Sequence, residues 1–584
     1  MLSYRKLAMR VLGRPLHTGG GIDSPRPASQ RAAAFVLTAA MLITLAAPAF
    51  AGTWYIENGD ITVKASGTEG KNKVSQGNNP EVEDTDTIIT NQKTDTASSH
   101  TVTIDAGNDK VEVTLDNVNI ETGSGSALTS KGDVTLTLKG DNHLTGGISG
   151  NGYGGSGIAS TGSLTISGGE TDSLTAQGGS GENGGDGISS KDLTISGGTV
   201  TATGGNSTGI AGSGGSGIHS GGDVTISGGT VTATGGDSTG SDGSGGYGIY
   251  SSSTTTISGG TVTATGGDST GSYSSGGYGI YSSGVTISGG STVTANGGSG
   301  KDGSGDGIFS FDPVAISGGT VTAKGGSGED GSGGRGIIST KSVTISGGTV
   351  NANGGSGKNG NGGNGIIGSG RVAISGGTVN AAGGDGGNGK DGGDGIYSSD
   401  IDLSGSLELT AKAGSPNGKA LSQRGNELDL NTIKDKLGPG AKVTTTDADG
   451  KVIDQVPIPR PVEPEKPVIP EESSSSSDGG SSAPSAPASP LPGLTVTDKS
   501  GAVISYTSTQ SGNTLTVCVG RLTASLHVSL AALRQLRAEG IETITFQTIL
   551  CSTTLSVDEL LAMGGEDAEA VLTHRFTDSS LTVG

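Results

Sequence analysis

A phrase of about thirty residues recurs along most of the chain, and it limits the possible folds more than any other feature. The segment ISGG marks each copy. Its Ile falls at Ile166, Ile195, Ile226, Ile257, Ile287, Ile316, Ile345 and Ile374, with Leu403 of IDLSG in the same role. Successive markers are 29–31 residues apart. Such a fixed period indicates one supersecondary unit stacked on copies of itself.

Inside one unit the hydrophobic pattern has a period of two. Val224 and Ile226 of VTISGG fall on one face, and Thr225 and Ser227 fall on the other. TVTATGG alternates in the same way, and GGYGIYSS supplies a third short run. Three short strands with Gly corners in about thirty residues predict one coil of a parallel β-helix, in which equivalent residues stack about 4.8 Å apart.

Two other structures are compatible with a glycine-rich repeat. A β-propeller blade needs four longer antiparallel strands in roughly 40 residues. A disordered tract would give no reason for β-branched residues to recur at fixed positions, as they do in this repeat. Gly supplies 114 of the 584 residues and aromatics only 3%, so a large conventional core is excluded. The sequence therefore favours an all-β fold, a parallel β-helix.

The N-terminal segment has the features of a secretory signal. Basic residues precede an apolar run over residues 32–50, which ends in a small-x-small motif. The alternative is a single transmembrane anchor. Residues 1–51 hold six of the 35 Lys and Arg residues and one of the 56 Asp and Glu residues, so the remainder carries a formal net charge of −26. This charge argues against nucleic acid as a partner.

The composition divides the chain into six segments. A small α+β module is predicted from a helix at 529–540 and a capping box of Ser556 and Glu559. Before it, NTIKDKLG predicts a short helix with Asn431 as its N-cap, and TTDADGKVI predicts a hairpin. The segments are a signal peptide (1–51), a cap with irregular first coils (52–147), regular repeats (148–414), a C-terminal cap (415–455), a Pro/Ser-rich linker (456–493) and the module (494–584).

The block VEVTLDNVNIETGSGSALTSKGDVTLTLKGDNHLTGG, followed by serial TISGGTVTATGG units, resembles the carbohydrate-binding β-helix proteins secreted by Firmicutes, notably clostridia. The likeness covers about residues 52–414. It implies a right-handed helix shaped like pectate lyases, polysaccharide as the partner, bound calcium and an extracellular or cell-surface location. No catalytic residue of that family has a matching position in this chain.

Catalysis is not supported by the residues themselves. The six His residues are scattered without metal-ligand spacing, and Arg335 and Arg371, the only arginines of the strict repeat, stand at non-equivalent positions. A pectate-lyase-like reaction needs clustered carboxylates and a basic proton acceptor on one face. We therefore expect that the protein is not an enzyme. A polysaccharide lyase ranks third among the possible functions.

Two outward rows of side chains are candidates for polymer binding. The residue after each GI is His219, Tyr250, Tyr281, Phe309 or Tyr397, with Ile at two coils between them, a stripe of rings that could stack on sugars. The alternative is that the glycine loops cover this strand. Thr230, Thr232, Thr261 and Thr263 belong to a hydroxyl array, although Thr is also common at solvent-facing β positions.

The loops before each GI and the two cysteines give two further expectations. Oxygen ligands of the kind that calcium takes are Asp302, Asp306, Asp385, Asp391 and Asp394; the alternative is that these aspartates only form turns. Cys518 and Cys551 lie in strand-like runs and form either a disulfide between neighbouring strands or two buried thiols.

The function that the sequence favours is a secreted, non-catalytic polysaccharide-binding β-helix protein. The alternative is a structural or adhesive surface spacer that presents the C-terminal module to a partner of unknown kind.

Overall fold

A computed structural model describes the chain in two parts. The first comprises residues 52–457 without 69, 150 and 151. The second comprises residues 494–583 without 499–500, 505, 512, 520, 522, 549–551, 564–568 and 576–577. The expected signal peptide and nearly all of the expected linker lie outside the described residues. The chain divides into two compact units between residues 461 and 462, and each unit is described by itself.

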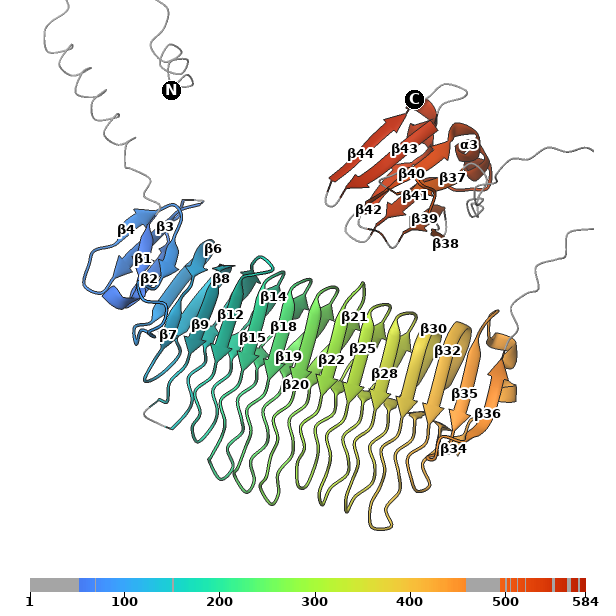
Figure 1. The fold of residues 1–584 in the computed structure, drawn as a ribbon, viewed down its shortest axis with the longest axis horizontal. Coiled ribbons are helices and arrows are strands. Elements are labelled where there is room, and N and C mark those ends of the chain that lie inside the picture. Colours follow the sequence, from blue (N-terminus) through green and yellow to red (C-terminus); the bar gives the residue numbers. More distant parts are fainter. Residues whose placement is uncertain are drawn as a thin grey trace, which may run out of the picture. The chain divides into compact units, whose positions relative to one another are not determined.

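The first unit is a parallel β-solenoid whose regular coils contribute three strand segments and, after the first coils, a long glycine-rich arm (Figure 1). The first face contains β2 (Ile61–Ala65), β10 (Ile158–Ser160), β13 (Ile188–Ser190), β16 (Ile218–Ser220), β23 (Ile308–Ser310), β26 (Ile337–Ser339), β29 (Ile366–Gly368), β31 (Ile396–Ser398) and β33 (Leu421–Gln423). The second face contains β5 (Ile88–Thr90), β11 (Ser163–Ser167), β14 (Asp192–Ile195), β17 (Val224–Ile226), β24 (Val314–Ile316) and β27 (Ser342–Ile345).

The third face is built from the TVTAT segments. It contains β7 (Asn119–Glu121), β9 (Asp141–Thr145), β12 (Ser173–Gln177), β15 (Thr199–Thr203), β18 (Thr230–Thr234), β20 (Thr261–Thr265), β22 (Thr292–Asn296), β25 (Thr320–Lys324), β28 (Thr349–Asn353) and β35 (Lys442–Thr446). Some strands run through a corner: β6 (Val102–Asp116), β8 (Leu128–Lys139), β19 (Ile249–Ile257) and β21 (Ile280–Ile287) join the first two faces, and β30 (Arg371–Ala382) and β32 (Ile401–Lys412) join the second and third.

The interior is a set of aliphatic ladders. In one coil Ile218, Val224, Ile226, Val231 and Ala233 all have no exposed surface. Ile218 pairs in register with Ile249 of the next coil, and the other four pair with aliphatic residues of the preceding coil, so the ladders continue along the solenoid. At Thr255, the next-coil counterpart of Val224, a buried threonine replaces the aliphatic residue. Full burial of one Val or Ile side chain contributes about 1.5–3 kcal/mol, which makes these thin ladders the main hydrophobic source of stability.

A buried serine ladder, which the sequence reading did not identify, lies beside the aliphatic ones. It occupies the third residue of the first-face strands, as at Ser220 and Ser251. The Ser220 hydroxyl donates to the backbone oxygens of Lys191 (2.8 Å) and Asp223 (3.0 Å). These bonds satisfy carbonyls where the chain turns from the first to the second face, which explains why a small hydroxyl residue is found there.

Glycine is needed at the corners and in the arms for different reasons. At the corner between the second and third faces, the second Gly of ISGG has a positive φ, as at Gly229 (φ 80°). In the arms the reason is contact distance. A Cβ on Gly246 would lie 1.9 Å from the backbone oxygen of Gly215 in the preceding coil, so no larger residue fits without a backbone shift.

The arms are hydrogen-bonded structures rather than the flexible loops that the sequence suggested. In one arm, the N–H groups of Gly204 and Ser207 donate to the next coil, and that of Gly205 donates to Gly185 on the returning segment of the preceding arm. Gly215 in turn donates to Gly205. Donors that point the same way recur every three residues, the period of a polyproline II helix. Each arm is therefore a two-layered extension of the solenoid, visible below the strands in Figure 1.

The ends of the solenoid are covered by short antiparallel additions. At the N-terminal end these are β3 (Asn72–Gln76), which pairs antiparallel with β2, and β4 (Val82–Asp84), which pairs antiparallel with β3. The chain before them forms β1 (Thr53–Tyr55), which pairs in parallel with β5, and the 3₁₀ turn η1 (Ile56–Asn58). At the other end, β34 (Asn426–Glu427) and β36 (Val452–Pro457) pair antiparallel with β33 and β35, which confirms the predicted hairpin. Because β33 and β35 still pair in parallel with the preceding coil, regular stacking continues to Thr446, beyond the expected boundary at residue 414.

The helix predicted at Asn431 is replaced by two 3₁₀ turns, η2 (Leu430–Thr432) and η3 (Lys434–Lys436). Asp429, not Asn431, is the N-cap, and its side chain accepts the N–H of Asn431. Leu430 and Ile433 are buried against the end of the core, and this packing favours two tight turns over one regular helix. Among the described residues, no helix has the length and apolar character that crossing a bilayer requires.

The second unit is an α+β module with its own hydrophobic core. One sheet contains β37 (Leu494–Thr497), β40 (Thr523–Ser529), β43 (Glu569–Arg575) and β44 (Asp578–Val583); the other contains β38 (Thr507–Ser511), β39 (Thr514–Cys518), β41 (Thr543–Gln547) and β42 (Ser552–Ser556). The two helices are α3 (Leu530–Ala538) and α4 (Val557–Met563). Ser529 caps α3 by accepting the N–H of Ala532, and Ser556 accepts the N–H of Glu559, as the sequence predicted.

Candidate functional site

Aromatic side chains gather where the arms return to the first face of the solenoid. The outer row, on the first-face strands, holds His219, Tyr250, Tyr281 and Phe309 in register. An inner row, three residues earlier in the coil, holds Tyr247 and Tyr278. We call these six rings, together with Phe311, the aromatic corner. All are partly exposed, and Phe311 has 45% of its surface exposed.

The rings contact one another along the solenoid axis. Tyr250, Tyr281 and Phe309 are stacked with centroid distances of 5.4 and 5.1 Å and planes within 10° of each other. Tyr247 stacks on Tyr278 at 5.7 Å, and both rows are within 5.5 Å of each other. Centroid separations in this range are typical of offset stacking, in which neighbours cover only part of each face. The corner therefore presents ring edges, partial faces and Tyr hydroxyl groups at the coil spacing.

The sequence identified the outer row but missed the inner row and Phe311. Tyr247 and Tyr278 belong to the phrase GGYGIY, repeated 31 residues apart, and that repetition could have signalled them. They were missed because, in the loops before GI, only the aspartates were considered as ligands. Tyr397 occupies the same register position as the outer row, but Ile338 and Ile367 separate it from the cluster.

A charged pair stands at each end of the aromatic corner. At one end, Asp186 Oδ2 lies 3.3 Å from His219 Nδ1, and this interaction raises the pKa of the His219 imidazole. At the other end, Asp306 Oδ2 lies 3.7 Å from the Arg335 guanidinium. Both aspartates occupy the inner row, in which two of the coils between them carry Tyr247 and Tyr278.

Asp306 is the most perturbed carboxyl group described in the solenoid. Only 1% of its surface is exposed, and burial raises its pKa to about 6 although Arg335 opposes the shift. Its charge also contributes, after burial, to raising the pKa of Tyr278 to about 12. A carboxylate held this deeply next to rings is more typical of a binding site than of a solvated turn.

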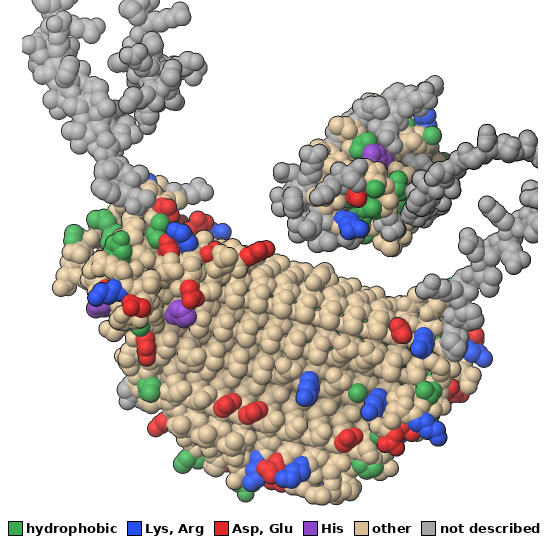
Figure 2. All heavy atoms as spheres, viewed as in Figure 1, with side chains coloured by type: hydrophobic (Ala, Val, Ile, Leu, Met, Phe, Trp, Pro, Cys, Tyr) green, Lys and Arg blue, Asp and Glu red, His purple; other side chains and the backbone are tan. Residues whose placement is uncertain are grey.

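The threonine array is confirmed as a regular outward surface. Thr230 and Thr232 pair with Thr261 and Thr263 of the next coil. The same two columns continue at Thr292 and Thr294. The sequence prediction omitted these two residues because Ser291 shifts the repeated phrase by one position. These side chains are partly or fully exposed. Figure 2 shows the surface over β12 to β30 as a broad area with few charged or hydrophobic side chains. It can offer hydrogen bonds to a flat neutral polymer.

The aspartates predicted as calcium ligands are distributed over different arms. Asp385 Oδ1 accepts a hydrogen bond from the backbone N–H of Ser415, and Asp394 Oδ1 accepts one from the backbone N–H of Lys419. Asp391 accepts a hydrogen bond from the side-chain amide of Asn417. Asp302 lies exposed near the tip of its arm. Three of these carboxylates thus complete hydrogen bonds between coils. Within the described part of the chain, no group of three or more His, Cys, Asp and Glu side chains is placed to bind a metal ion, and calcium binding stays a prediction.

Only one cysteine of the predicted disulfide lies within the described residues. The Cys518 sulfur lies 3.5 Å from Gln547 Oε1, and burial raises the pKa of its thiol. Cys551 lies outside the described residues, so the bond stays a prediction.

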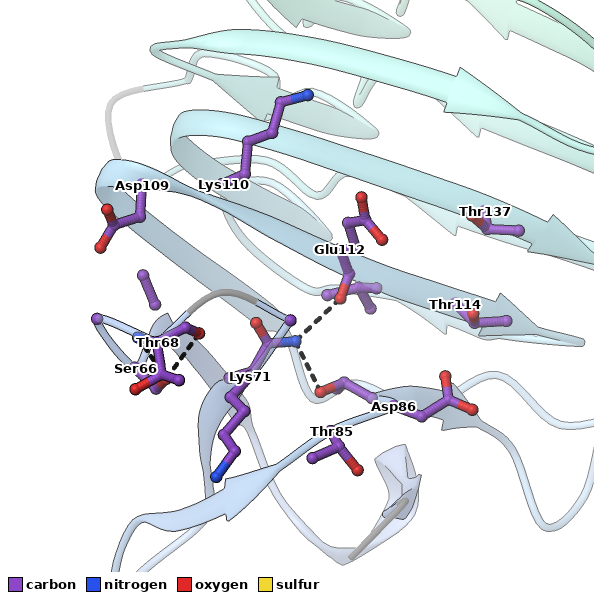
Figure 3. A pocket seen from close by; sticks show the side chains of 16 residues that line it. Ser66, Thr68, Lys71, Thr85, Asp86, Asp109, Lys110, Glu112, Thr114 and Thr137 are labelled. Atoms are coloured by element: carbon purple, nitrogen blue, oxygen red, sulfur yellow. Dashed lines mark hydrogen bonds between the residues drawn. The ribbon is translucent and has the colours of Figure 1, made fainter. Parts of the chain in front are cut away.

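A separate polar cavity of about 490 Å³ lies at the N-terminal end of the solenoid, between the β2–β3 hairpin and β6 (Figure 3). The Asn72 amide crosses it to Thr87 Oγ1 and the Glu112 backbone oxygen, each at 2.9 Å. Lys71 and Lys110 point away from each other (Figure 3). None of the side chains predicted from sequence to bind a ligand lines this cavity.

Comparison with known proteins agrees with this architecture. Five segments match the Beta helix repeat family: residues 193–222, 224–249, 256–280, 314–337 and 343–366. The chain is a parallel β-helix protein. Neither the curated proteins nor the solved structures include a significant match to it. The matched segments contain mainly second-face and third-face strands and the arms that follow them, and they include His219, Tyr247 and Tyr278 of the aromatic corner but not its other rings. The match describes a fold rather than an activity.

Proposed function

We propose that this chain is a secreted, non-catalytic protein that binds polysaccharide along the aromatic corner. The observation that carries the proposal is the unbroken run of rings over successive coils, from His219 to Phe309 in the outer row. Partly exposed rings at the coil spacing of about 4.8 Å offer a repeating apolar contact to a polymer that also repeats. Charged pairs at both ends offer hydrogen bonds to sugar hydroxyl groups.

The threonine face provides a second surface for the same class of ligand. A soluble chain would bind in the corner between arm and strands, whereas an insoluble, flat polymer would also contact the hydroxyl array. The excess of negative charge favours neutral over acidic polymers as ligands. Calcium, if present, would shift this preference by bridging carboxylates of the arms to an acidic chain.

The test compares the full-length protein with the Tyr250→Ala/Tyr281→Ala variant on immobilised cellulose and pectin. The matched control is Tyr397→Ala, which removes a ring at the same register position but outside the cluster. We expect the double variant to lose most of its binding and the control to keep it. No binding by the wild type, or equal losses in both variants, would refute the proposal.

A second candidate function is that of a surface spacer carrying residues 494–583, which have a hydrophobic core of their own. In that case binding to cells or polymer would depend on the module, and the Tyr250→Ala/Tyr281→Ala variant would bind as well as the wild type.

A further inference from the structure

Asp306 combines deep burial with an unfulfilled hydrogen bond. Its Oδ1 accepts the backbone N–H of Arg335 at 2.6 Å, which ties it to the next coil. Its Oδ2 is buried and has no hydrogen-bond partner. An ionised oxygen without a donor is unfavourable in a buried place, because the water that it loses on folding is not replaced.

Arg335 covers this oxygen without satisfying it. The closest guanidinium nitrogen, Nη1, is 3.7 Å from Asp306 Oδ2, too far for a hydrogen bond. The Arg335 side chain is 47% exposed, so it can rotate into solvent and open a path to the carboxylate. The pair is therefore an acceptor and a donor held slightly too far apart, at the end of a row of rings.

The other aspartates of the inner row differ from Asp306. Asp186 uses both oxygens, one with the Ser216 backbone N–H and one with His219. Asp394 accepts a backbone N–H in the same manner as Asp306, but it is partly exposed and belongs to the coil of Tyr397, outside the aromatic corner. Glu57 also has a buried oxygen without a partner, but it lies in the N-terminal cap. Among the described carboxylates, only Asp306 brings a buried oxygen without a hydrogen bond to the aromatic corner.

We propose that Asp306 and Arg335 form a hydroxyl-binding subsite that makes the aromatic corner selective for neutral, hydroxyl-rich glycans. One sugar hydroxyl donates to Asp306 Oδ2 and accepts from the Arg335 guanidinium, which closes the gap between them. The apolar edge of the same sugar contacts Tyr278 and Phe309. A uronic acid unit fits less well, because its carboxylate cannot donate a proton in place of a hydroxymethyl group and its negative charge is repelled by Asp306.

This inference rests on the proposed function, and the experiment separates the two. Binding of the full-length protein to hydroxyethylcellulose, galactomannan, dextran and polygalacturonate is measured by affinity electrophoresis at pH 7.5. The variants are Asp306→Asn, Arg335→Gln and the matched control Asp394→Asn, which changes an equivalent carboxylate away from the rings. Unfolding temperatures show whether each variant is folded.

We expect the wild type to bind at least one neutral polymer, the Asp306→Asn and Arg335→Gln variants to bind it about tenfold more weakly, and the control to stay within about twofold. Arg335→Gln changes an exposed side chain, so it serves if Asp306→Asn fails to fold. Wild-type binding that both variants retain, or binding of polygalacturonate alone, overturns the subsite. A wild type that binds none of the polymers overturns the proposed function and the subsite with it.

Discussion

Replacing Gly246 by alanine tests the idea that close packing, rather than backbone freedom, requires glycine in the arms. The added Cβ would lie 1.9 Å from the backbone oxygen of Gly215. That oxygen belongs to the backbone, so either arm must move. The movement strains two hydrogen bonds, from Gly246 N–H to Gly236 and from Gly267 N–H to Gly246, each 2.8 Å long.

The expected effect is large and local. Overpacking contributes about 1–3 kcal/mol and the two hydrogen bonds about 0.5–1.5 kcal/mol each, so the arm should lose roughly 2–6 kcal/mol of local stability. In a solenoid each coil contacts only its neighbours, so the loss should spread over few coils. Hydrogen–deuterium exchange should show faster exchange in arm peptides around Gly215, Gly246 and Gly277, while the strands of distant coils stay protected.

Gly290→Ala is the matched control. Gly290 lies at a corner of the same solenoid, where a Cβ would meet nothing within 4 Å, and its φ is not in the left-handed region. The control should leave exchange unchanged or stabilise the protein by about 0.4–1 kcal/mol through the unfolded chain. Equal exchange in the two variants would show that the arms are not packed as described.

Two other predictions concern titration and the threonine face. Burial raises the pKa of Asp306 to about 6, whereas an aspartate in the unfolded chain has a pKa of about 3.9. Between these two pH values the native state binds more protons than the unfolded state, so ionisation of Asp306 lowers the stability as the pH rises. The stability of the wild type relative to Asp306→Asn should therefore increase from pH 7 to pH 4.5, by about 2 kcal/mol in chemical denaturation. A difference that stays constant with pH would contradict the burial of this charge. Thr232→Lys/Thr263→Lys should fold normally, since both side chains are partly exposed, but should bind insoluble cellulose more weakly than soluble hydroxyethylcellulose relative to the wild type. A parallel change on both polymers would remove the threonine face from the proposal.

The repeat determines the coil by itself. Alternation in VTISGG and TVTATGG assigns Ile226 and Val231 to the interior and Thr232 to the surface, and the structure has them there. Register follows because a slip by one residue would expose the entire aliphatic ladder. The outer-row residues Tyr250 and Tyr281 could be aligned for the same reason, since each has a fixed position after a buried Ile.

The tertiary structure decided what the sequence left open, because those features depend on contacts between coils rather than on periodicity within one. Gly246 and Gly290 are the same residue type, yet only the packing of adjacent arms makes one irreplaceable. Tyr247 joins Tyr250 in one cluster only because the arm folds back onto the first face. Asp306 and Asp394 stand at equivalent positions in their coils. Asp306, at the aromatic corner, is buried and has one oxygen without a hydrogen bond, whereas Asp394 is partly exposed. Local alternation therefore sets the coil, while the neighbours that stacking brings to each side chain set its chemistry.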